Sequence, residues 1–374
     1  MPPPGEGACC CTTNLFAGRS PGGPSRAGPP KLKEPPIPHA DDLLLVTGAT
    51  GLVGSHVAER ARQLGLRTRA LVRPGADTKL LADWGVELAP GELTDQAALQ
   101  QAVAGATLIV HCAAKVGDWG PVEDYRQVNV RGLEHLLVAA ETAGNLRRFI
   151  HISSLGVYPG RDHHGTDESE PIQLAGIDGY TLTKAEAEQV VLRRIQDRNL
   201  PATILRPGFI YGPRDRTVLP RLLERLRSGQ VKFFGTGEQL MNNTYVGNLV
   251  SVIFDVLEKP QAIGQIYNIT DGRLVSKRDF ISTVAQLAGY EVPQAAIPLG
   301  LARTLTRVSE NVFRLLRRKE APLLSSARFK FLGLNLDFSI DKARRELGYL
   351  PQVPFELGMQ HTVAWFREQG LVKP

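Results

Sequence analysis

The sequence contains few cysteines and no long apolar run. Only four of its 374 residues are cysteine, and three of these, Cys9 to Cys11, are adjacent near the N-terminus. This arrangement offers no disulfide framework, so we expect a reducing, cytoplasmic location. No apolar run reaches the ~20 residues that a membrane-spanning helix needs.

Aromatic residues and metal-binding patterns are also scarce. Because aromatic content is 6% and no nucleic-acid-binding motif occurs, the net charge of +6 does not predict binding to nucleic acid. His163 and His164 lie in a polar stretch without cysteine or acidic partners at ligand spacing, so we predict no metal site.

Residues 1–40 hold ten of the 26 prolines and show almost no apolar periodicity. We expect a disordered, Pro/Gly-rich tail, and the segment has no apolar core typical of a secretory signal. A mis-assigned start site and a transit peptide are the alternatives for this segment.

Strands and helices alternate between residues 43 and 211. Short apolar segments predict strands at 43–47, 67–72, 86–89, 107–111, 148–153 and 202–207. Helical periodicity predicts helices near 52–64, 78–84, 95–104, 122–143 and 179–199. This alternation predicts an α/β fold with a doubly wound parallel sheet of the Rossmann type. We expect residues 41–212 to bind NAD(P) and residues 213–374 to form mainly a smaller substrate-binding lobe, interleaved with the Rossmann core.

A glycine-rich turn follows the first predicted strand. Gly48, Gly51 and Gly54 lie between the apolar segment 42–46 and a segment with helical periodicity. Strand, glycine turn and helix in this order indicate a dinucleotide site, because the helix N-terminus offers free N–H groups to a pyrophosphate. No Gly-Lys-Ser/Thr follows, so the turn is not a Walker loop.

Arg73 ends the second predicted strand. NAD enzymes usually place an acidic residue here, whereas an arginine suits the 2′-phosphate of NADP. Asp77 is a weaker rival for the ribose, and Arg73 as a solvated loop charge is the alternative interpretation. We therefore predict NADP as the cofactor, with NAD as the second choice.

Tyr180 and Lys184 occupy positions i and i+4 of a predicted helix and share one face of it. A cation about 4 Å from a phenol contributes roughly 4 kcal/mol at an effective dielectric of about 20. We therefore expect Lys184 to lower the pKa of Tyr180 by roughly three units from ~10. Tyr180 would then exchange a proton with an alcohol or carbonyl, and Ser154 would stabilise the substrate oxygen. An amphipathic helix with a snorkelling lysine is the alternative.

With these residues, the chain resembles the extended short-chain dehydrogenase/reductases over about residues 42–370. The resemblance implies catalytic roles for Ser154, Tyr180 and Lys184, with Asn129 supporting a proton relay and Lys184 also contacting the ribose. Segments 91–95, 110–115 and 205–213 resemble the stretches that contact adenine, line the cofactor and touch the nicotinamide. The implied cofactor contacts are Gly48, Thr50, Gly51, Leu52, Val53, Gly54, Arg73, Glu92, Leu93, Ala113, Ala114, Lys115, Tyr180, Lys184, Pro207 and Phe209.

Met241 separates two branches of this family. It stands where sugar-nucleotide epimerases and dehydratases carry an arginine for the substrate diphosphate. A thioether cannot neutralise a diphosphate, but it packs well against an apolar ligand. Segments 113–120 and 267–272 resemble the 3β-hydroxysteroid dehydrogenase branch, which includes 2-alkyl-3-oxoalkanoate reductases.

The resemblance therefore implies a hydrophobic substrate of the steroid, sterol or 3-oxoacyl kind, in contact with Met241. A sugar-nucleotide epimerase or dehydratase and a non-catalytic redox sensor are the alternative functions. The resemblance also implies a homodimer through the helices at 122–143 and 179–199.

Residues 301–319 combine positive charge with helical apolar periodicity. Six basic residues stand against one acid, Glu310, which gives a local charge of +5: Arg303, Arg307, Arg314, Arg317, Arg318 and Lys319. Another face carries Leu301, Leu305, Val308, Val312 and Leu315. We favour a helix of the substrate lobe with a solvated basic face. The alternative is a helix on a membrane surface that gives access to lipid substrates.

Overall fold

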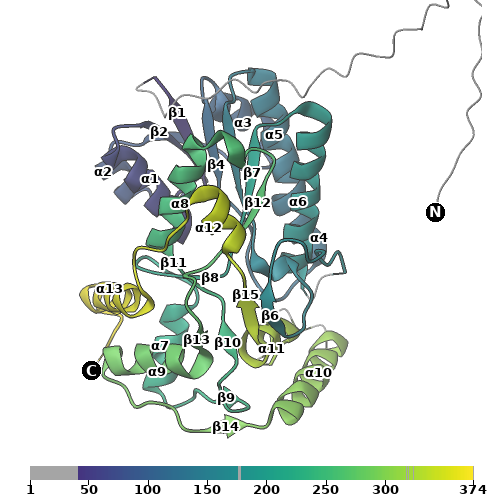
Figure 1. Ribbon diagram of the computed structural model, residues 1–374, viewed down its shortest axis with the longest axis vertical. Coiled ribbons are helices and arrows are strands. Elements are labelled where there is room, and N and C mark those ends of the chain that lie inside the picture. Colours follow the sequence, from purple (N-terminus) through teal and green to yellow (C-terminus); the bar gives the residue numbers. More distant parts are fainter. Residues whose placement is uncertain (1–40, 176–177, 317, 319, 323, 374) are drawn as a thin grey trace, which may run out of the picture. The chain divides into compact units, whose positions relative to one another are not determined.

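The computed structural model describes residues 41–373 except 176, 177, 317, 319 and 323 (Figure 1). The tail predicted to be disordered, residues 1–40, lies outside the described residues.

A parallel sheet of seven strands forms the centre of the fold (Figure 1). Its strands are β1 (Leu43–Thr47), β2 (Arg67–Val72), β3 (Glu87–Pro90), β4 (Leu108–His111), β5 (Arg148–Ile152), β7 (Ala202–Pro207) and β12 (Ile266–Ile269). The order is β12-β7-β5-β4-β1-β2-β3, and every pairing is parallel. The predicted doubly wound α/β fold is confirmed. The direction of winding reverses between β1 and β4, and ligands bind at the carboxyl ends of strands beside such a point.

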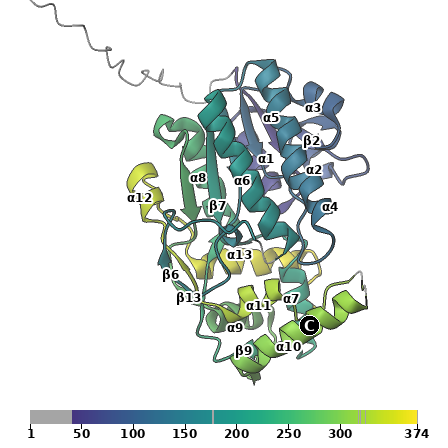
Figure 2. The ribbon, with the colours of Figure 1, turned by 90° about the vertical axis from the view of Figure 1, so that its right-hand side faces the viewer.

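Helices cover both faces of the sheet. The two layers consist of α1 (Leu52–Gln63), α2 (Lys79–Asp83) and α8 (Val246–Glu258) on one face, and α3 (Gln96–Val103), α5 (Gly132–Ala143) and α6 (Gly179–Arg198) on the other. Successive side chains of a strand point to opposite faces, so Leu44 joins the first layer's apolar cluster and Leu45 joins the second. Figure 2 shows α5 and α6 side by side on their face. A dimer through these helices stays a prediction.

The helix predicted at 122–143 is interrupted. It consists of α4 (Val122–Arg126), a π-helical turn at Gln127–Arg131, and α5. The wider turn inserts one extra residue, and such turns often occur at functional sites. Here it carries the buried Asn129.

The C-terminal half contributes to the sheet layers as well as to the lobe. β12 forms one edge of the sheet, and α8 packs against α1. The remaining helices are α7 (Leu219–Arg227), α9 (Lys277–Ala288), α10 (Leu299–Leu315), α11 (Ser326–Gly333), α12 (Asp341–Leu347) and α13 (Phe355–Glu368). Four short strand pairs accompany them: β8 (Phe209–Tyr211) with β11 (Asn243–Tyr245), β9 (Phe233–Phe234) with β14 (Ala296–Ile297), β10 (Leu240–Met241) with β13 (Val275–Ser276), and β6 (His163–Thr166) with β15 (Leu336–Phe338). The boundary at residue 212 remains a prediction.

Helix α10 exposes both its basic and its apolar residues. Arg303 and Arg307 are solvated, as expected for a lobe helix with a basic outer face. However, Leu301 and Val308 are also exposed, which packing of the apolar side into the lobe would have prevented. Within the described ranges, each helix is too short or too polar to cross a bilayer.

Candidate active site

The glycine turn after β1 forms a cradle for a dinucleotide. Gly48 has a left-handed backbone (φ +68°), and the Gly51 N–H donates to its carbonyl at 3.0 Å. A Cβ on Gly54 would lie 2.3 Å from that same oxygen, so the helix approaches the turn at a distance that excludes any side chain there. Gly51 is exposed and caps α1 without a side-chain hydrogen bond, which leaves N–H groups free for an anion. The turn therefore fits a pyrophosphate.

Two arginines that the sequence analysis missed flank this turn. Arg214 and Arg216 line a hollow with Thr50 and Asp77. Arg214 donates to Glu59 at 2.5 Å, and Arg216 pairs with Asp77 at 3.6 Å. Both arginines come shortly after the segment 205–213. Their position next to that segment is the feature of the sequence that could have identified them as candidate cofactor contacts.

The residues that follow β2 and β3 differ in how exposed their side chains are to a cofactor. Arg73 is exposed just past the end of β2, the strand that pairs with β1 beside the glycine turn. Glu92 is also exposed, whereas Leu93 is buried in the core under α5, where its Cβ lies 2.7 Å from the position of a Cβ on Gly132. The side chain of Leu93 is thus part of the core, and a cofactor contact by Leu93 stays a prediction.

Asn129 clamps the loop after β4 onto α6. Its Oδ1 accepts the Lys115 N–H at 2.7 Å, and its Nδ2 donates to the Lys115 carbonyl at 3.0 Å and to the Thr183 hydroxyl at 2.9 Å. This clamp holds the main chain of Ala113, Ala114 and Lys115 at the carboxyl edge of the sheet. Thr183 was not among the predicted residues, and the relay role of Asn129 stays a prediction.

Ser154, Tyr180 and Lys184 meet at the carboxyl end of β5. Ser154 follows the strand and accepts the Gly156 N–H at 3.0 Å, which starts a short helical turn. Tyr180 lies in the first turn of α6, close enough to the Ser154 side chain for that side chain to oppose the rise of its pKa. Lys184 is buried one turn later and donates to the Ile152 carbonyl at 2.7 Å. The three side chains that the spacing singled out therefore come together.

Burial sets the protonation of the tyrosine and the lysine. It raises the pKa of Tyr180 to about 12, a shift that the hydrogen bond from Ser154 opposes and the charge of Asp178 increases. It lowers the pKa of Lys184 to about 8, against the opposing charges of Cys112 and Glu188. The expected lowering of the Tyr180 pKa is therefore wrong for the protein alone. The physical reason is that taking a phenolate out of water is the largest effect, and the charge of Asp178 adds to it.

A family model described as "NAD dependent epimerase/dehydratase family" matches residues 44–270. The chain belongs to this family. It is an NAD(P)-dependent oxidoreductase of the extended short-chain type, as the motifs indicated.

The chain is similar to two bacterial reductases along most of its length. A 2-alkyl-3-oxoalkanoate reductase of Stenotrophomonas maltophilia is 31% identical over 335 residues, which cover 86% of this chain and 98% of the relative. A 4-hydroxy-2-methyl-3-oxo-4-farnesyl-3,4-dihydroquinoline-1-oxide ketoreductase of Stigmatella aurantiaca is 30% identical over 316 residues, which cover 84% and 93%. The crystal structure of gox2253 matches with a TM-score of 0.77 and 34% identity, covering 89% of this chain and all of that one.

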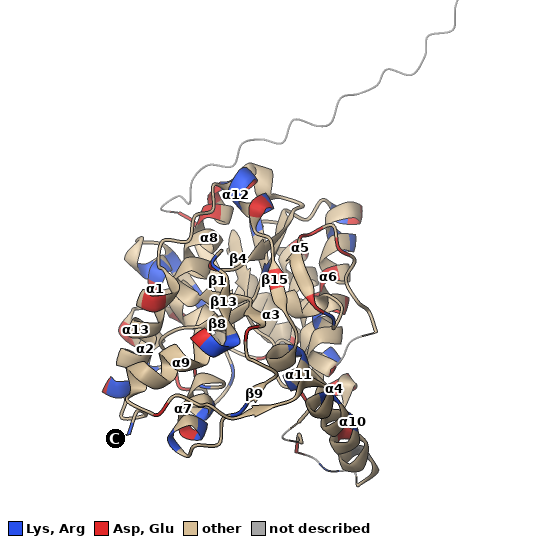
Figure 3. Cartoon of the chain, turned by 60° about the horizontal axis from the view of Figure 1, so that its bottom comes forward, with Lys and Arg blue, Asp and Glu red and all other residues tan. Residues whose placement is uncertain are grey.

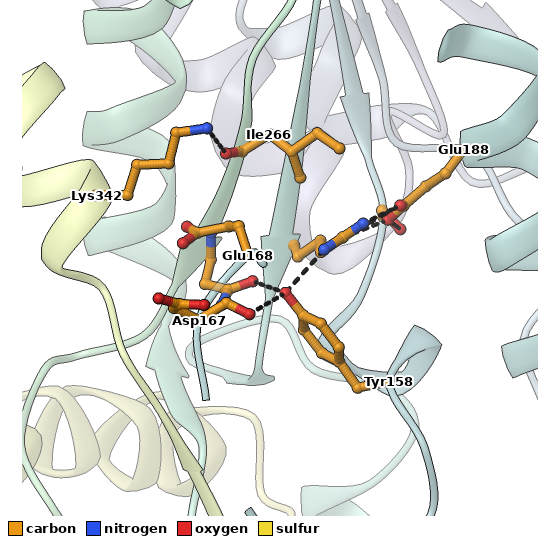
Figure 4. A network of polar contacts seen from close by, with 9 residues as sticks. Tyr158, Asp167, Glu168, Glu188, Ile266 and Lys342 are labelled. Carbon is orange, nitrogen blue, oxygen red and sulfur yellow. Dashed lines mark hydrogen bonds and ion pairs between the residues drawn. The ribbon is translucent and has the colours of Figure 1, made fainter. Parts of the chain in front are cut away.

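In this short-chain enzyme, a buried polar network includes Tyr158 and Glu188 (Figure 4). The Ser153 hydroxyl donates to Glu188 at 2.5 Å, and Glu188 pairs with Arg206 at 2.6 Å. Arg206 also donates to the Tyr158 hydroxyl at 2.7 Å, which in turn donates to Asn268 at 2.9 Å. The network joins the end of β5 to α6, β7 and β12, and so positions Ser154 relative to α6. Its signal in the sequence is a single arginine inside the apolar strand 202–207.

The segment beyond β7 is apolar. Phe209 packs against Phe280 and Phe331, with ring centroids 5.6 and 4.9 Å apart, and Pro207 ends the strand just before it. Met241 is buried in the adjoining apolar cluster. The contact of Met241 with substrate stays a prediction.

Replacing Arg206 with methionine should destabilise the protein severely, because it leaves the buried Glu188 charge unpaired. We expect a loss of about 3–5 kcal/mol in the free energy of unfolding, measured by urea denaturation. The exposed Arg345, which pairs with the half-buried Glu346, provides the control: Arg345→Met should cost roughly 1 kcal/mol or less. The double variant Arg206→Met/Glu188→Met should recover stability relative to the single one. Equal losses in the two single variants would contradict this role of the network.

Proposed function

We propose that this enzyme is an NADP-preferring reductase that acts on the ketone of a hydrophobic substrate. The observation that carries the proposal is the placement of Tyr180 beside Ser154 and one helical turn from the buried Lys184. The reductases from Stenotrophomonas and Stigmatella carry alkyl or farnesyl groups in the names of their substrates, which supports an apolar ketone.

The side chains perform the proton chemistry of ketone reduction. A bound nicotinamide would supply the hydride to the carbonyl carbon. Tyr180 is protonated at neutral pH and donates its proton to the substrate oxygen, which completes the secondary alcohol. Ser154 hydrogen-bonds the same oxygen and stabilises its developing negative charge. The ammonium of Lys184 stabilises the tyrosinate that remains until a proton returns from solvent.

The apolar surroundings favour a ketone over a sugar nucleotide. A sugar nucleotide brings a diphosphate, which needs a cation near the substrate, and Met241 offers none. The half-buried rings of Phe209 and Phe331 instead provide contacts for an apolar chain or ring system.

The cofactor preference follows from the arginine at the end of β2. Arg73 is exposed just past the strand that pairs with β1 beside the glycine turn, where the adenosine ribose lies in this fold. A guanidinium there pairs with a 2′-phosphate, which NAD lacks. We therefore propose NADP as the preferred cofactor.

Tyr180→Phe should lower kcat by roughly 10²–10⁴-fold while leaving NADPH affinity nearly unchanged, because only the proton donor is lost. The assay follows NADPH oxidation with steroid ketones, 3-oxo acids and sugar nucleotides, and NADPH affinity is measured by fluorescence titration. Tyr290→Phe, which removes a hydroxyl bonded to the Lys373 carbonyl far from this site in sequence, serves as the control. Substantial activity in the Tyr180→Phe variant would refute the mechanism. Turnover of sugar nucleotides only, with tightly bound NAD in the purified protein, would favour the epimerase or dehydratase.

Arg73→Ala should raise KM for NADPH by roughly 10–100-fold, because a charge-assisted hydrogen bond to a phosphate is lost. KM for NADH should change little, so the ratio of the two constants is the measured quantity. Arg67→Ala, an exposed arginine at the other end of β2, is the matched control. Parallel changes in both constants would contradict the NADP assignment.

The rate of reduction should fall as pH rises through about 8. The pKa of Lys184 is lowered to about 8, so its ammonium is present below that pH and lost above it. The pKa of Tyr180 lies near 12, so its proton is retained throughout this range. In Lys184→Arg the guanidinium stays charged up to pH ~12, and the fall near pH 8 should disappear even if the maximal rate is lower. A pH profile of kcat with the same midpoint in both proteins would contradict this assignment.

A further inference from the structure

Helix α10 carries an exposed apolar stripe. The stripe consists of residues spaced three or four apart, whose exposed fractions are 51, 40, 55, 44 and 83% for Leu301, Leu305, Val308, Val312 and Leu315. Residues at this spacing lie on one face of a helix. Helix α10 lies at the margin of the C-terminal lobe beside α11 (Figure 2, Figure 3). The stripe is therefore a continuous apolar surface open to solvent.

The opposite, mostly polar side of α10 is the side that packs inward. Ala302, Thr306 and Glu310 are buried. Glu310 accepts hydrogen bonds from the Ser326 N–H at 2.6 Å and from the Ser326 hydroxyl at 2.8 Å, at the start of α11. Rotating the stripe inward would break these bonds and expose Ala302. The outward orientation of the stripe is thus held by the packing of the opposite face.

The charge around the stripe is positive. Arg303, Arg307 and Arg318 are exposed, whereas Glu310 is turned inward. A helix with an apolar face and exposed basic residues is typical of proteins that lie on anionic bilayers. A second copy of the chain is a poorer occupant, because pairing two stripes would bring two sets of arginines together.

Helix α10 and its neighbour α11 are joined to the loops around the catalytic serine. The Trp119 indole N–H donates to the Arg318 carbonyl at 3.0 Å, and Arg328 pairs with Asp118 at 2.7 Å. The Lys330 ammonium donates to the carbonyls of Gly156 and Tyr158, at 2.9 and 2.7 Å, just after Ser154. These contacts connect the helix that carries the stripe to the loop after β4 and to the short helical turn that follows Ser154.

We propose that the α10 stripe docks on the surface of an anionic lipid bilayer. Docking places the loops that flank Ser154 near the lipid in which an apolar ketone partitions. The docking itself does not depend on the proposed reductase activity, whereas entry of substrate from the bilayer rests on it.

The test is sedimentation of the full-length protein with vesicles of phosphatidylcholine alone or with added phosphatidylserine. We expect binding to the vesicles that contain phosphatidylserine. Leu301→Ser/Leu305→Ser should lower the partition coefficient at least about tenfold, because two apolar side chains no longer enter the lipid. Arg303→Ala/Arg307→Ala should lower it roughly tenfold, and the loss should be confined to vesicles with phosphatidylserine.

The matched control is Leu274→Ser/Leu350→Ser, which makes the same chemical change at two exposed leucines outside α10 and should bind as the unaltered protein does. Thermal unfolding and NADPH titration show whether each variant is folded, and neither readout depends on turnover. The proposal is overturned if the unaltered protein does not sediment with phosphatidylserine vesicles, or if the α10 leucine variant binds them equally well. A dimer through α10 would also overturn the proposal. In that case sedimentation velocity without lipid would show a dimer for the unaltered protein and a monomer for the α10 leucine variant, and neither protein would bind vesicles.

Discussion

The buried ion pair between Glu188 and Arg206 determines where helix α6 lies against the sheet. Both groups are out of water, so each needs the other, and both are held further by hydrogen bonds to Ser153 and Tyr158. Ser153 directly precedes Ser154, and Glu188 lies one turn after Lys184 on the same helix. The pair therefore sets the distance between the strand end that carries Ser154 and the helix that carries Tyr180 and Lys184.

Burial also decides the chemistry of that helix. The surroundings that hold α6 in place remove water from the phenol and from the ammonium, and so move their pKa values in opposite directions. The tyrosine keeps its proton and the lysine comes close to losing its own. In the protein alone the tyrosine is protonated, so it can act only as a proton donor, which is the role that the proposed carbonyl reduction gives it.

The C-terminal half extends this arrangement outward. Lys330 of α11 bonds the carbonyls that follow Ser154, and Glu310 of α10 bonds the first residue of α11. Polar contacts thus connect the turn after Ser154 to α11 and α11 to α10, and they involve the polar face of α10. The apolar face of α10 is left outside because a buried carboxylate keeps its hydrogen bonds only in that orientation. An exposed apolar surface is in this way a consequence of satisfying a buried charge.

The sequence by itself determined the parallel α/β fold, the glycine turn and the triad of Ser154, Tyr180 and Lys184. The spacing of residues along the chain is sufficient to predict these features. The repeat of a strand or a helix determines which face a side chain lies on, and the carboxyl ends of parallel strands lie at one edge of the sheet. Only the tertiary structure decided the roles of Arg206, Glu188 and Arg214, whose partners lie far away in the chain. It also decided the direction of the Tyr180 pKa shift and the outward face of α10. Burial and long-range pairing depend on what the rest of the chain places around a residue, and no local pattern contains that information.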